Sequence, residues 1–239
     1  MFVPAFKLLG IDQPSIIATS FAIQCFGMTA GSIAWYRFSR KQNITLEPAW
    51  DEYLNLVRAF AIPTILGVVF GQTLFQPSNH QQTILVFKVF SAIFGVAILV
   101  TTYQLRKSMK TGLSVEELLS IKNRMLMRTL FYITGFVGGA ITAWLSIGVG
   151  ELIAILLILL RYPVAMSVGV AVTVSAIAVW VGVHKYIWFS GGINLNILVF
   201  AGPAALVGGT LARRVVSYLT ATQLKIVIAC WVLISAAAM

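Results

Sequence analysis

The chain is a succession of nine apolar segments, and seven of them are about as long as a bilayer span requires. Hydrophobic residues make up 59% of the sequence and charged residues 10%, against roughly 45–50% and 25% in soluble domains. Because a span must satisfy its own backbone hydrogen bonds, we expect an all-α, polytopic membrane protein. The segments cover residues 1–9, 15–35, 54–75, 83–104, 129–145, 150–160, 164–183, 195–212 and 222–238.

Basic residues lie in the gaps between these segments and predict the orientation of the chain. The net charge is +10, but Lys and Arg are spread over several gaps, so no patch for nucleic acid is expected. The gaps over 36–53 and 105–128 contain basic residues, whereas the gap over 76–82 contains none. Loops rich in Lys and Arg stay in the cytoplasm. Residues 106–128 are therefore predicted to form a cytoplasmic linker with a short amphipathic helix on the membrane surface.

The two halves of the chain share segment lengths, proline positions and loop charge. Placing Pro14 on Pro163 aligns residues 6–35 with residues 155–184 without gaps, and the basic and weakly charged gaps of the two halves alternate in opposite order. Secondary transporters are commonly built from inverted repeats of this kind. We therefore expect two inverted helical repeats, residues 1–105 and 129–239, with broken or short helices at mid-membrane.

The same alignment leaves the first repeat incomplete at its N-terminus. Met1 corresponds to Gly150, so the first half has no counterpart to residues 129–149, a helix followed by a glycine-rich turn. Either the repeat is naturally shortened or the chain begins at an internal methionine. We expect the second, because residues 1–9 would otherwise lie in lipid without a partner.

A flexible break followed by an acid separates two of the apolar segments. Residues 146–151 have the sequence Ser-Ile-Gly-Val-Gly-Glu, and the run from Gly150 to Leu160 covers only about 16 Å as a helix, roughly half of the hydrocarbon core. A short helix whose positive N-terminal end lies at depth is the arrangement by which transporters hold anions. The predicted substrate-binding residues at the break are Ser146, Gly148, Gly150 and Glu151.

Glu151 has two interpretations. It is either an intramembrane acid that couples proton movement to substrate movement, or a hydrated residue at the end of a short helix. A carboxylate would compete with an anion for the same helix dipole. We therefore expect Glu151 to be protonated when the anion is bound.

Polar side chains within the spans are further candidates. Hydroxyl and amide groups in spanning helices commonly form hydrogen bonds between helices, and some of them contact substrate. The predicted substrate-binding residues of this kind are Thr19, Ser20, Gln24 and Thr173.

Glycines and aromatic residues have structural interpretations. Small residues allow close helix packing, which we expect at Gly135, Gly138, Gly139, Gly208 and Gly209. Aromatic residues near segment ends are typical of membrane interfaces. The predicted anchors are Trp35, Tyr36, Tyr53, Tyr103, Trp188 and Tyr218.

Catalytic and metal-binding patterns are missing from the sequence. Cys25 and Cys230 are far apart, and His80 and His184 have no second ligand at metal spacing. The glycines of the break lack the third glycine of a nucleotide-binding loop. We therefore expect no catalytic site, no metal and no cofactor.

Several short motifs are spread over both halves of the chain: Val3-Pro4, Gly10 to Pro14, Ala18-Thr19-Ser20, Gly202-Pro203 and Leu211 to Arg214. These motifs resemble those of the sulfite exporter TauE/SafE family, permeases of sulfur-containing anions and other small substrates. The resemblance covers nearly the whole chain and implies the inverted-repeat fold.

Together these features predict a multi-pass protein of the cell inner membrane, with a small anion and the lipid bilayer as its partners. The predicted function is export of a small anion, sulfite or an organosulfur anion, by alternating access, with or without proton coupling. Two alternatives remain open. One is a membrane assembly or scaffolding factor without transport, and the other is an intramembrane enzyme, for which the sequence lacks the residues.

Overall fold

A computed structural model describes residues 13–44, 52–73, 124–146, 148–160, 162–218 and 223. Within these ranges every regular element is a helix, and four helices are long and apolar enough to cross a membrane. The prediction of an all-α membrane protein is confirmed. The elements are α2 (Gln13–Ile44), α3 (Tyr53–Thr73), α6 (Arg124–Leu145), α7 (Val149–Leu159), α8 (Val164–Lys185), the π-helix η2 (Tyr186–Ser190) and α9 (Leu195–Tyr218).

The helix bounds follow the apolar segments, with one large difference. Helix α2 continues to Ile44, well beyond the apolar segment predicted to end at residue 35, because its last turns are polar and leave the hydrocarbon layer. The predicted segments 1–9, 83–104 and 222–238 and the amphipathic helix of the linker lie outside the described residues.

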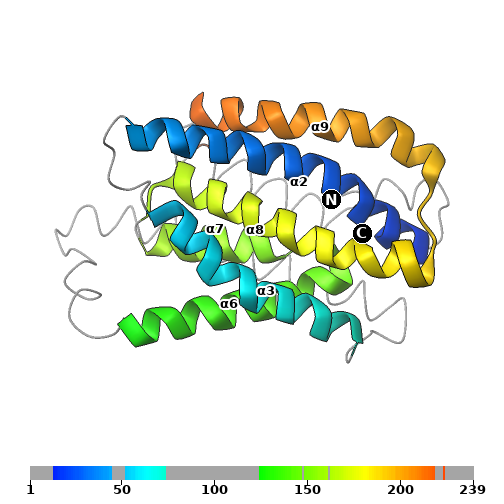
Figure 1. The fold of residues 1–239 in the computed structure, drawn as a ribbon, viewed down its shortest axis with the longest axis horizontal. Helices are drawn as coiled ribbons and strands as arrows, with labels where there is room; N and C mark the ends of the chain where they lie inside the picture. The colour runs from blue at the N-terminus through cyan, green and yellow to red at the C-terminus, as the bar shows by residue number, and fades with distance from the viewer. Residues whose placement is uncertain are drawn as a thin grey trace.

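The helices lie side by side with their long axes roughly aligned (Figure 1). Helix α2 packs between α9 and α8, and α3 packs against both α6 and α8. The chain runs in opposite directions in α2 and α8, and also in α3 and α9 (Figure 1). The short helix α7 lies against α8 and α6, so the break between α6 and α7 is enclosed by protein.

Glycines bring two pairs of helices into backbone contact. A Cβ atom on Gly67 would overlap the Phe136 carbonyl oxygen, and one on Gly209 would overlap that of Gly27. These contacts join α3 to α6 and α9 to α2. The prediction of close packing is confirmed at Gly209, whereas an added Cβ at Gly208 would meet no atom of the described residues within 4 Å.

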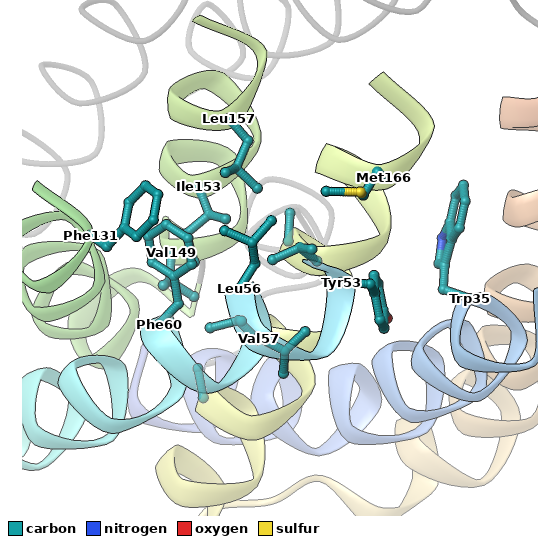
Figure 2. Packing of buried hydrophobic residues seen from close by; sticks show 14 of the residues in the cluster. Trp35, Tyr53, Leu56, Val57, Phe60, Phe131, Val149, Ile153, Leu157 and Met166 are labelled. Atoms are coloured by element: carbon teal, nitrogen blue, oxygen red, sulfur yellow. The ribbon is translucent and has the colours of Figure 1, made fainter. Parts of the chain in front are cut away.

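The main core joins α3, α6, α7 and α8. Val149, Ile153 and Leu157 form the inner face of α7 and pack with Phe60 and Phe131 (Figure 2). This packing holds a helix of 11 residues, which by itself is too short to span a bilayer.

Trp35 and Tyr53 belong to the same core, so the prediction that they anchor the membrane interface is wrong. Their exposed fractions are 2% and 1%. The absence of a side chain at Gly169 lets both rings lie against the backbone of α8, because a Cβ there would be 3.1 to 3.2 Å from each ring.

Candidate substrate site at the helix break

The chain leaves α6 and enters α7 through a turn that needs unusual backbone angles. Ser146 has φ of 56° and Gly148 has φ of 142°. Positive φ is uncommon for residues other than glycine, and the angle at Gly148 is one that glycine tolerates. The predicted short helix beginning near Gly150 and ending near Leu160 is confirmed, since α7 covers Val149–Leu159.

The first amide groups of α7 bond to side chains on both sides of the turn. The Val149 N–H donates to Oγ1 of Thr142 over 2.9 Å, and the Gly148 N–H donates to Oε2 of Glu151 over 2.9 Å. The Thr142 hydroxyl in turn donates to the Gly138 carbonyl over 2.8 Å. A carboxyl oxygen of the chain therefore occupies the N-terminal end of α7, where the helix dipole favours negative charge.

Gln24 of α2 holds the other side of the turn. Its Nε2 lies 2.7 Å from the carbonyl oxygen of Ser146, 2.8 Å from the Ser146 hydroxyl and 3.2 Å from the Ser20 hydroxyl. The Gln24 amide nitrogen carries two protons, so its two N–H donors are shared among these three oxygen acceptors. Gln24, Ser20 and Ser146 form one polar cluster.

Helix α8 closes the turn from a third side. A Cβ on Gly150 would overlap the Ser175 hydroxyl, so the lack of a side chain at Gly150 is what allows this contact. Gln24 and Ser175 both lie well inside candidate membrane spans, Ser15–Lys41 and Val164–Ser190. The turn therefore lies at depth, among polar groups from several helices.

The family model for sulfite exporter TauE/SafE matches residues 1–239. The chain belongs to this family. Comparisons with curated proteins and with solved structures found no match. Family membership confirms the resemblance seen in the motifs, and it identifies the chain as a membrane protein of a family that transports sulfur-containing anions.

Two residues predicted for the substrate site of this TauE/SafE protein lie elsewhere. Thr19 accepts a hydrogen bond of 2.9 Å from the Asn194 N–H, next to the start of α9. Thr173 lies with its Oγ1 2.6 Å from the Tyr53 hydroxyl and 3.3 Å from Oγ of Ser32. The structure brings together Ser146, Gly148, Gly150, Glu151, Ser20 and Gln24, and it places Thr19 and Thr173 in separate hydrogen-bonded contacts.

Two polar residues at the break of this TauE/SafE protein were not predicted. Thr142 is one helical turn before Ser146. Its position could have been predicted from the sequence, because a hydroxyl one turn before the break can reach the amides of the next helix. Ser175 gave no signal of its own. Among the described residues no group of three His, Cys, Asp or Glu side chains could hold a metal ion.

Proposed function

We propose that this protein exports a small sulfur oxyanion, sulfite or an organosulfonate, and binds it at the break between α6 and α7. The observation that carries the proposal is the hydrogen bond of 2.9 Å from the Gly148 N–H to Oε2 of Glu151. It supports the proposal because a carboxyl oxygen already occupies the N-terminal end of α7. A substrate oxygen of the same charge fits the same position.

Glu151 then competes with the substrate for that amide. When an anion binds there, a second negative charge on Glu151 is unfavourable, and uptake of a proton by Glu151 removes it. When the anion leaves, the carboxylate returns to Gly148 and releases the proton. This exchange links the binding of one anion to the movement of one proton.

Alternating access in this proposal uses two inverted repeats, residues 1–105 and 129–239, which exchange conformations. The helix contacts support the repeat. In an inverted repeat α2 corresponds to α8, and α3 corresponds to α9. The contact between α2 and α9 should then have a counterpart between α8 and α3. Both contacts exist, and each pair of corresponding helices is antiparallel (Figure 1).

The proposed location is the cell inner membrane, with the basic residues of the inner helix ends facing the cytoplasm. Export is the proposed direction, as the name of the family indicates. The alternative, an assembly or scaffolding factor with the same fold, predicts no anion movement at all.

Counterflow in vesicles tests the proposed function. Purified protein in liposomes preloaded with sulfite should accumulate labelled sulfite, and methanesulfonate should compete more strongly than chloride. Liposomes without protein and liposomes with Gly150→Leu serve as controls, because a leucine would fill the space that Ser175 contacts. Absence of counterflow for sulfite and all sulfonates would favour the scaffolding alternative.

A further inference from the structure

Thr64 of α3 carries an unpaired hydroxyl inside the protein. Its exposed fraction is 0%, and within the described part of the chain its Oγ1 is the buried side-chain atom that has no hydrogen-bond partner. Threonine in a helix commonly donates to a carbonyl oxygen three or four positions earlier. Thr73 on the same helix does so, at 2.8 Å from the Val69 carbonyl.

Packing alone does not account for a threonine at this position. Val68, one turn further along α3, is also 0% exposed and lies beside the same glycine of α6, Gly139. Valine has nearly the same shape as threonine but no hydroxyl. A valine at position 64 would fill the space without leaving a polar atom unpaired, which is unfavourable in a buried site.

Consecutive glycines of α6 place Thr64 beside the candidate substrate site. The carbonyl of Thr64 lies against Gly139, while the preceding Gly138 lies against Val149, the first residue of α7. Thr142, one turn further along α6, binds the Val149 N–H. Thr64 therefore lies near the level of the α7 N-terminus along α6.

We propose that Thr64 is a substrate-binding residue whose hydroxyl donates a hydrogen bond to the bound oxyanion. The inference rests on the proposed function and deepens it. Sulfite and sulfonates have three oxygen atoms around sulfur. The Gly148 N–H binds one of them in place of Glu151, and Thr64 of α3 binds another. An anion held in this way joins the first half of the chain to the second.

The test compares three variants in sulfite counterflow and in thermal unfolding. Thr64→Val removes only the hydroxyl, Thr64→Ser keeps it, and Thr73→Val makes the same change at an exposed hydroxyl of the same helix. We expect Thr64→Val to raise the half-saturating sulfite concentration about tenfold, as for loss of one hydrogen bond to a charged group. Its unfolding temperature without sulfite should equal or exceed that of the wild type. Thr64→Ser should stay within about twofold of the wild type, and Thr73→Val should match it.

Several outcomes would overturn the inference. Wild-type sulfite dependence in Thr64→Val would show that the hydroxyl does not contact substrate, while the proposed function would stand. Equal losses in Thr64→Val and Thr64→Ser would indicate a packing role. Thr64→Ala repeats the comparison if the valine variant does not accumulate. If the wild type itself moves no sulfite, the proposed function fails and this inference fails with it.

Discussion

The side-chain amide of Gln24 donates to both oxygens of Ser146, the carbonyl at 2.7 Å and the hydroxyl at 2.8 Å, across 122 positions of sequence. This contact fixes α2 to the turn at which Ser146 adopts φ of 56°. It thereby ties the conformation of the first half of the chain to the geometry of the substrate site.

Replacing Gln24 by Leu should weaken this connection. The variant leaves the Ser146 carbonyl without its donor, so we expect a loss of about 1–3 kcal/mol in the free energy of unfolding and loss of sulfite counterflow. Thermal unfolding in detergent and vesicle flux measure the two effects. Thr29→Val, which removes an exposed contact of α2 with Trp180, should change both far less. Normal flux in Gln24→Leu would exclude the amide from substrate binding.

Glu151→Gln should separate binding from coupling. A glutamine cannot exchange a proton, so we expect sulfite to bind and to counterflow, while a pH gradient no longer drives net sulfite movement. Proton flux and sulfite flux are measured in the same vesicles. Glu52→Gln, which changes an exposed carboxyl outside the spans, is the matched control. Net movement driven by the gradient at the wild-type rate in Glu151→Gln would assign Glu151 a purely structural role.

Adjacent glycines of α9 should respond in opposite ways to alanine. In Gly209→Ala the new methyl group meets the Gly27 carbonyl oxygen, so α9 must separate from α2, at a cost of about 1–3 kcal/mol. In Gly208→Ala the methyl group meets no atom of the described residues within 4 Å, and the better helix propensity of alanine stabilises the helix by up to about 1 kcal/mol. Unfolding temperatures of the two variants measure the difference. Equal values would contradict the close approach of α2 and α9.

Cysteine labelling should confirm the orientation. In a background without Cys25 and Cys230, an impermeant maleimide applied to intact cells should label Ser190→Cys, which is exposed at the end of η2. Lys41→Cys, at the exposed basic end of α2, should react only after the membrane is opened, because basic ends face the cytoplasm. The reverse pattern would invert the topology.

The contact between Tyr162 and Glu52 should depend on pH. Burial and then the nearby Glu52 carboxyl, which accepts a hydrogen bond of 3.1 Å, raise the pKa of Tyr162 from 10.0 to about 12. Because the neutral phenol is the donor, its stabilisation is complete below pH 10 and is lost as the pH approaches 12. We expect Tyr162→Phe to lower stability by about 1 kcal/mol or less at pH 7 and pH 9 alike. If the difference in unfolding free energy between Tyr162→Phe and the wild type disappears between pH 7 and pH 9, this prediction is wrong.

Features with a local cause could be predicted from the sequence. Long apolar runs predict helices because a span must satisfy its own backbone groups. The break was predictable because Gly148 tolerates backbone angles that a side chain resists, and because the run to Leu160 is too short to cross. The end of α2 was not predictable in this way, since hydropathy reports only the part of a helix that lies in lipid.

Features that depend on neighbouring helices could not be predicted. Thr173 and Ser175 are two positions apart on one helix and therefore face nearly opposite directions. Only the packing of α8 shows that Ser175 contacts Gly150 while Thr173 contacts Tyr53. The burial of Trp35 depends in the same way on a glycine far away in the sequence.

The shortness of α7 also constrains how the protein is made. With 11 residues, α7 is too short to be inserted on its own as a transmembrane segment. Its unpaired terminal amides become acceptable in lipid only when Thr142 of the preceding helix is beside them. Helices α6 and α7 are therefore expected to enter the membrane together during biosynthesis, so that the turn between them is assembled in a single step of insertion.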